Sequence, residues 1–261
     1  MISSYPTIHQ DHDFYHDVAS GEVPGHSLMN KFGAGDIGTS IVPVTNSLVY
    51  QTPTAAQSLE FVSSSANDTS TGVGAREITI QGLDSNWDMV MLTIATNGTT
   101  AVSLPTDLVR LFRWTVSGSG TYATQTAGSH AGTLTVRAAG GGATWATIPS
   151  LPFPFAQSEI GVYTVPRGYT GYLISRDLTT DTSKSLNAYL FQRPNADTVV
   201  APYSSMRVVE RFVGVNAIAP PIKASKGPFV GPCDIGFMAE VSVGSAVVSV
   251  NFTLLLVEDG Y

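Results

Sequence analysis

The fold class is decided by residues 76–98, which read REITIQGLDSNWDMVMLTIATNG. Polar and apolar residues alternate from Arg76 to Gln81, and this period of two is typical of a half-buried β-strand. Turn residues follow at 82–86, and the apolar run Met89–Ala95 predicts a second strand. Asn97-Gly98 favours the positive φ angles of a type I′ turn, so residues 99–104 are expected to fold back on this run as a hairpin.

The same signature continues along most of the chain. Runs with strand character recur about every ten residues between Gly, Pro, Asn and Asp, as in sandwiches and jelly rolls. Further runs lie at 58–62, 109–116, 132–136, 160–165, 171–174, 186–192, 206–215, 235–243 and 246–257. No segment has sustained helical periodicity, and only a short helix is expected, near residues 106–112. The sequence therefore predicts an all-β fold, an antiparallel β-sandwich of jelly-roll type.

Changes of composition along the chain predict three parts. Residues 1–45 hold four of the five histidines and many Gly and Pro breaks, so an extended, irregular N-terminal arm is expected. A second change comes at Gly140-Gly141-Gly142 and the proline-rich segment 148–154, because proline cannot donate to a sheet ladder and favours linkers. Behind the arm 1–45 we therefore expect two packed β-sandwich subdomains, 46–147 and 148–261.

The arm has two interpretations, which the sequence leaves open. It docks on a neighbouring subunit, or it wraps its own domain. In the first case its large apolar side chains are the candidate assembly residues, namely Phe14, Tyr15, Leu28 and Phe32.

Three histidines of the arm are weak candidates for a metal site. His9, His12 and His16 stand beside aspartates, and neutral imidazole and carboxylate both bind transition metals. On a helix the three would share a face, but Pro6 upstream and Gly21 downstream leave little room for a stable one. Solvated side chains without a metal are the expectation.

Composition excludes several function classes. Charged residues make up 13% of the chain, and the formal net charge is −7, so no basic field is present for direct nucleic-acid binding. The low charge suits a protein whose outside faces other protein. A single cysteine, Cys233, excludes an internal disulfide framework and a Cys-based zinc cluster. The start has no signal-peptide pattern, and no apolar run approaches the roughly 18 residues of a membrane span, so synthesis in the cytoplasm without a membrane partner is expected.

Catalytic and cofactor motifs are weak. Residues 33–38, Gly-Ala-Gly-Asp-Ile-Gly, match the G-x-G-x-x-G spacing, but no strand is predicted before them and no helix after, so we interpret the glycines as turns in the arm. No G-x-S-x-G is present, and His130, the histidine outside the arm, is expected to be exposed in a Gly/Ser/Thr loop. The acidic residues are scattered, which leaves a converging pair open. We expect no enzyme, no catalytic residue and no cofactor.

A tyrosine cluster is an alternative site. Aromatic rings stack on sugars and also fill sandwich cores, so a carbohydrate-binding surface and a core are both open. The residues are Tyr163, Tyr169, Tyr172, Tyr189 and Tyr203.

Several stretches resemble a family of uncharacterised virion-associated structural proteins of tailed bacteriophages, many from aquatic bacteria. The resemblance is carried by residues 64–69, 72–87, 96–102 and 160–173, and by Asn30-Lys31-Phe32-Gly33 and Asp36-Ile37-Gly38-Thr39 in the arm. These are turn-and-strand patterns, which indicate kinship better than activity. Met89–Ala95 departs from the family by being more apolar, as a buried contact surface would be.

The resemblance implies a structural part of the virion that acts through protein–protein contacts. A ring or collar subunit near the portal and tail, or an anchor for fibres, is the first expectation, and a capsid decoration protein is the second. The partners would be copies of itself and the portal, adaptor, tail or major capsid protein. A receptor- or glycan-binding module, with a host surface glycan as partner, is the competing function class.

Overall fold

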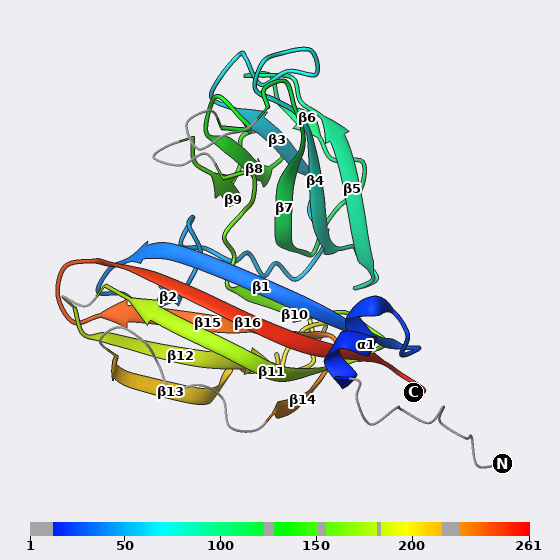
Figure 1. Ribbon diagram of the computed structural model, residues 1–261, viewed down its shortest axis with the longest axis vertical. Helices are drawn as coiled ribbons and strands as arrows, with labels where there is room; N and C mark the ends of the chain where they lie inside the picture. Colours follow the sequence, from blue (N-terminus) through cyan, green and yellow to red (C-terminus); the bar gives the residue numbers. More distant parts are fainter. Residues whose placement is uncertain (1–12, 123–127, 151–154, 182–183, 216–224) are drawn as a thin grey trace.

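The computed structural model describes residues 13–122, 128–150, 155–181, 184–215 and 225–261. These ranges form sixteen strands and one short helix, and every strand pairing between them is antiparallel (Figure 1). The predicted all-β, antiparallel sandwich fold is confirmed. The strands make two lobes: a jelly-roll lobe of residues 26–44 and 161–258, and an inserted lobe of residues 45–160.

The jelly-roll lobe consists of two packed sheets. One has the order β1-β16-β11-β14, and the other has the order β10-β15-β12-β13 with β2 also paired to β15. When β2 and β10 are counted as one strand position, the sheets hold positions 1-8-3-6 and 2-7-4-5, the winding order of a jelly roll. The strands are β1 (His26–Ile37), β2 (Val42–Pro43), β10 (Val162–Val165), β11 (Tyr169–Thr180), β12 (Leu186–Arg193), β13 (Arg207–Val215), β14 (Lys226–Val230), β15 (Cys233–Val241) and β16 (Ala246–Glu258).

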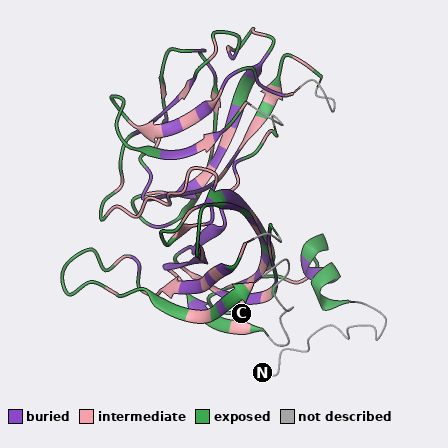
Figure 2. Cartoon of the chain, turned by 90° about the vertical axis from the view of Figure 1, so that its left-hand side faces the viewer, coloured by how far each residue is buried: buried purple, intermediate pink, exposed green. Residues whose placement is uncertain are grey.

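Alternation along the strands produces the core of this lobe. On β16 the even-numbered residues from Val248 to Leu256 point between the sheets and are at most 2% exposed, and Ile235 and Phe237 of β15 face them. Burial of each such side chain stabilises the fold by about 1.5–3 kcal/mol. Buried residues lie within both lobes and at their junction (Figure 2).

The N-terminal region differs from the expected irregular arm. Residues 26–37 form β1, which pairs with β16 from His26↔Val257 to Ile37↔Ala246 without a register shift. Residues 14–20 form helix α1 (Phe14–Ser20), which Asp13 caps by accepting from the Tyr15 amide and which ends at Gly21 in the left-handed region. The part from residue 26 onward therefore belongs to the chain's own sheet. This agrees with the interpretation that the arm packs on its own domain.

The inserted lobe interrupts one strand of the jelly roll. β2 pairs with Met238 and Ala239 of β15, and β10 pairs with residues 233–236, so the two segments lie end to end along one neighbour. Phe237 lies between them: its carbonyl accepts from the Val44 amide and its own amide donates to Gly161. The division into 46–147 and 148–261 is thus replaced by a lobe that begins and ends beside Phe237.

Glycine makes this junction possible. A Cβ at Gly33 of β1 would overlap the backbone nitrogen of Gly161, and one at Gly35 would overlap the Thr45 carbonyl. Both glycines lie in a strand, so the interpretation of Gly33 and Gly35 as turns is wrong. Their missing side chains let β1 lie against the two chain segments that connect the lobes.

The inserted lobe is a second sandwich. Its sheets have the orders β6-β3-β8-β9 and β5-β4-β7. The strands are β3 (Leu59–Ser63), β4 (Ala75–Leu83), β5 (Met89–Ala95), β6 (Val102–Ser103), β7 (Arg110–Ser119), β8 (Leu134–Ala138) and β9 (Thr144–Ile148). Trp114 and Phe61 pack edge to face at its centre, with ring centroids 6.0 Å apart.

Two local predictions in this lobe are wrong. β6 pairs with β3 rather than with β5, because a type I′ turn needs positive φ at both central residues and here only Gly98 has it, at 59°. The Gly98 amide donates to the Asp68 carbonyl instead, and the chain continues into the β6-β3-β8-β9 sheet. Residues 106–112 form no helix, and β7 begins at Arg110. Within the described part of the chain no helix is long and apolar enough to cross a membrane.

Candidate functional site at the junction of the lobes

The expected assembly residues fall into two groups. Phe14 and Tyr15 lie on α1 and are 36% and 41% exposed, with their rings edge to face. Leu28 and Phe32 lie in β1 and are half-buried. The structure therefore leaves the first pair available for a partner, while the second pair belongs to a sheet of its own lobe.

The histidine site is only partly placed. His9 and His12 lie outside the described residues, and His16 lies exposed on α1. Among the residues that the structure describes, no three His, Cys, Asp or Glu side chains gather as metal ligands would. The aspartate cap at residue 13 and Gly21 provide the two helix ends that sequence reasoning missed.

His130 is buried rather than exposed, with 6% of its surface accessible. Its Nδ1 lies 3.1 Å from the Ser129 hydroxyl and its Nε2 lies 3.1 Å from the Pro149 carbonyl. A carbonyl only accepts, so Nε2 carries the proton and Nδ1 accepts from Ser129. Both ring nitrogens serve to hold a loop of the inserted lobe.

The five tyrosines do not form one surface. Tyr163 is fully buried against Phe112, with ring centroids 4.7 Å apart, and burial raises the pKa of its hydroxyl. Tyr172 lies in β11 and Tyr189 in β12, which belong to different sheets. The core interpretation holds for Tyr163, and the carbohydrate surface is not assembled as expected.

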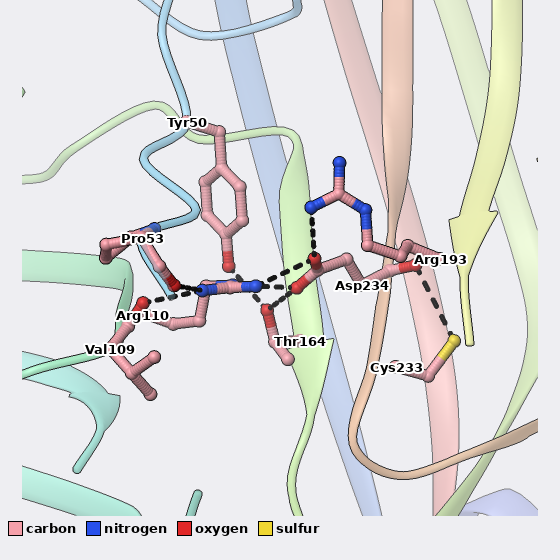
Figure 3. A network of polar contacts seen from close by, with 8 residues as sticks. All are labelled: Tyr50, Pro53, Val109, Arg110, Thr164, Arg193, Cys233 and Asp234. Atoms are coloured by element: carbon pink, nitrogen blue, oxygen red, sulfur yellow. Dashed lines mark hydrogen bonds and ion pairs between the residues drawn. The ribbon is translucent and has the colours of Figure 1, made fainter. Parts of the chain in front are cut away.

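A buried ion pair joins the two lobes (Figure 3). Arg110 begins β7 in the inserted lobe, and Asp234 lies in β15 of the jelly-roll lobe. The Arg110 Nε lies 2.9 Å from Asp234 Oδ1 and Nη2 lies 3.1 Å from Oδ2, and both side chains are 1% exposed. This two-point contact is the geometry that guanidinium and carboxylate favour. Because each buried charge needs the other, the pair fixes the position of one lobe on the other.

Neighbouring polar groups complete the network. The Thr164 hydroxyl donates to Asp234 Oδ1 at 2.7 Å, because an ionised carboxylate only accepts, and Thr164 in turn accepts from the Tyr50 hydroxyl at 2.7 Å. Burial is the main cause that raises the pKa of Tyr50, and the charge of Asp234 adds to it. Burial also raises the pKa of the adjacent Cys233 thiol to about 12, so this thiol stays neutral. The Arg110 guanidinium lies 4.8 Å from the Trp87 ring centroid.

A second set of contacts joins β1 to β7. The Lys31 ammonium donates to the Phe112 carbonyl, and the Arg113 guanidinium donates to the Asn30 carbonyl. Lys31 is only 4% exposed, and its burial, with the nearby charge of Arg113, holds the pKa of the ammonium below its usual value. The two lobes therefore meet through charged groups on both sides of the junction.

At this junction the polar side chains pair with one another. Asp234 is engaged by Arg110 and Thr164, and Cys233 is neutral, whereas catalysis needs a nucleophile or base that reaches a substrate. Sequence reasoning missed the pair because 124 positions separate Arg110 from Asp234, and only the fold brings them together. The sequence signal was a charged residue within the apolar run 109–116 and another directly before the run 235–243.

Comparison with known proteins gives little further guidance. No protein-family model matches the chain, and no curated protein matches. Among solved structures, infectious bursal disease virus Gx strain shares 12% identity over 90% of this chain and 72% of that chain, with a TM-score of 0.25. A chain of the Gt strain of the same virus is 13% identical in sequence. That match covers 91% of this chain and 75% of the viral chain, with a TM-score of 0.23. A chain of the VP2 subviral particle of this virus is also 13% identical. That match covers 90% of this chain and 77% of the viral chain, with a TM-score of 0.19.

Proposed function

We propose that this protein is a non-catalytic structural component of a tailed-bacteriophage virion that acts through protein–protein contacts. The resemblance of residues 64–69, 72–87, 96–102 and 160–173 to virion-associated proteins motivates the proposal. The jelly roll is compatible with it, since viral capsid domains use this fold, but lectins and cupins use it as well. The fold alone therefore does not decide the function.

The observation that carries the proposal is the locked insertion. A lobe inserted into one strand of a jelly roll and held by the buried Arg110–Asp234 pair is a stiff, two-lobed block. A building block needs such stiffness, because each copy must present its contact surfaces at a fixed angle. The low charge of the chain, 13% Asp, Glu, Lys and Arg, favours broad contact with other protein.

Within the virion we place the protein in a ring or collar near the portal and tail, or at a fibre anchor. Head-to-tail contacts generate rings when the rotation closes. Such contacts need a projecting element and a different receiving surface. α1, with Phe14 and Tyr15 exposed, is the projecting element.

The test is to measure the protein in purified phage particles. Quantitative mass spectrometry should find the chain at a fixed copy number per particle, and gold-labelled antibody should mark the neck or tail in electron micrographs. Label spread over the head would replace the ring with a decoration role. Absence of the chain from particles that are infectious would overturn the virion role itself.

A further inference from the structure

A groove runs along the outer face of the β12–β13–β15 sheet. Three adjoining cavities of about 240, 300 and 320 Å³ share lining residues, so they form one continuous depression. Arg193 lines the first two, and Phe191, Met206 and Met238 line the second and third. The floor is apolar, and Met206 and Val208 are 39% and 60% exposed there.

Positive charge surrounds this apolar floor. Arg193, Arg207 and Arg211 line the second and third cavities, and the one acidic residue that lines them, Asp234, is already paired with Arg110. The Arg211 guanidinium lies over the Tyr189 ring, 5.5 Å from its centroid, and both residues line the third cavity. In a chain with net charge −7, three arginines on one groove are a local reversal of sign.

Arg193 has an unused donor. Its Nε is buried and has no hydrogen-bond partner, while its Nη1 lies 3.9 Å from Asp234 Oδ2 (Figure 3). The Arg193 side chain as a whole is 29% exposed, so a carboxylate in the groove would give its guanidinium a further acceptor. The groove therefore suits an occupant that brings acidic groups together with apolar or aromatic ones.

The N-terminal segment of the chain has this chemistry. Residues 1–30 contain four acidic residues and no lysine or arginine. Asp13, directly before α1, and Phe14 and Tyr15, its first two residues, are all exposed. A carboxylate thus lies next to two aromatic rings. Charge complementarity thus selects this segment of a second copy as the partner for the groove.

We infer that the groove receives the Asp13-Phe14-Tyr15 segment of a neighbouring copy, with the rings on the Met206–Val208–Met238 floor and the carboxylates beside the arginines. The inference rests on the proposed function, and it deepens that function by naming the contact between copies. Because projecting segment and groove are different surfaces, the contact is head-to-tail and repeats from copy to copy.

A charge exchange between full-length variants tests this contact. One variant carries Asp11→Arg and Asp13→Arg. The other carries Arg207→Asp and Arg211→Asp, and Arg207 and Arg211 are both exposed. Light scattering at low salt should show association of the wild type, and association at least tenfold weaker for each variant alone. Mixing the two should restore assembly, because one contact in the mixture is native and the other has both charges reversed.

The control makes the same change of net charge elsewhere. Arg76→Asp with Arg167→Asp replaces two exposed arginines outside the groove and should assemble as the wild type does. Circular dichroism checks that every variant is folded. Equal loss of assembly in the control, or no rescue on mixing, would overturn the inference, and so would a wild type that stays monomeric at 100-fold different concentrations. The virion role would survive each of these results if the chain is found in particles.

A covalent readout gives an independent check. Chains with Tyr15→Cys and chains with Val208→Cys should form a disulfide-linked dimer when mixed and oxidised, since the native Cys233 is buried. Val230→Cys, exposed on β14, is the matched control and should not link to Tyr15→Cys. Equal disulfide formation by Val208→Cys and Val230→Cys would contradict specific binding of α1 in the groove.

Discussion

The two lobes differ in how far along the chain their pairings reach. In the jelly-roll lobe the first long strand pairs with the last, β1 with β16, over twelve residues. In the inserted lobe all described pairings lie within residues 45–160. Long-range pairing costs more chain entropy before it gains contacts. The jelly-roll lobe therefore depends on both ends of the chain, and the junction depends on both lobes.

The largest effect is expected at the ion pair. Asp234→Ala would leave the Arg110 guanidinium buried without its partner, and we expect a loss of about 3–5 kcal/mol in the free energy of unfolding, measured by denaturant titration. Arg110→Met combined with Asp234→Leu removes both charges and should recover most of that loss. A single substitution that costs no more than a surface change would show that the junction does not lock the lobes.

A smaller effect is expected where β1 touches the junction. Gly33→Ala places a methyl group against the Gly161 backbone, and overpacking of this kind costs about 1–3 kcal/mol. Gly38→Ala is the matched control, since its Cβ would meet nothing within 4 Å, and should change stability by less than about 0.5 kcal/mol. Equal effects of the two substitutions on thermal unfolding would contradict the close approach of β1.

The buried Lys31 at the junction makes the free energy of unfolding depend on pH. Its folded pKa lies below the usual 10.5, so between these two values the unfolded chain binds more protons and stability rises with pH. Lys31→Met removes this dependence. The free energy of unfolding of the wild type, relative to Lys31→Met, should therefore increase as pH rises toward 10.5. Using the difference removes the opposite effect of Tyr50 and Tyr163, which both proteins share. A difference that stays constant with pH would contradict the burial of a charged Lys31.

The smallest effect is expected at the edge of the inserted lobe. β5 carries no charge or proline and pairs with β4 without a bulge, whereas the edge strand β13 of the other lobe carries Arg207, Glu210 and Arg211 and pairs with register shifts. Met91 is 68% exposed, so Met91→Lys should change the free energy of unfolding by less than about 0.5 kcal/mol. Val250→Ala in the central strand β16 should cost more than this, because it leaves a cavity between the sheets, yet less than the loss of the ion pair. Similar urea midpoints for both variants would contradict the placement of these strands.

The same contrast explains what could be read from the sequence. Alternation identified β3, β4, β7 and most jelly-roll strands, because that signal is local. It missed β1, since Gly33 and Gly35 break the pattern and are needed for a contact with Gly161 and Thr45. The insertion was also missed, because a strand split between Val42–Pro43 and Val162–Val165 leaves only two short fragments.

The candidate site could not be predicted from local sequence patterns either, because its residues are far apart along the chain. Arg110 and Asp234 meet only when β7 is placed on β15, and the groove arginines come from two strands. Of the four residues named as assembly candidates, Phe14 and Tyr15 are exposed on α1, while Leu28 and Phe32 were assigned to an arm that is a strand. Local sequence thus indicated apolar residues near the N-terminus, and only the fold showed which residues hold the lobes together.

The most direct test of the proposed virion role is electron cryomicroscopy of purified phage particles in which mass spectrometry detects this chain. We expect a two-lobed density, repeated about a symmetry axis, in which the jelly-roll and inserted lobes keep one mutual orientation in every copy. The fitted chain should place α1 of each copy against the neighbouring subunit. Particles without such a density, or lobes that take different angles from copy to copy, would contradict a rigid structural block held at the Arg110–Asp234 junction.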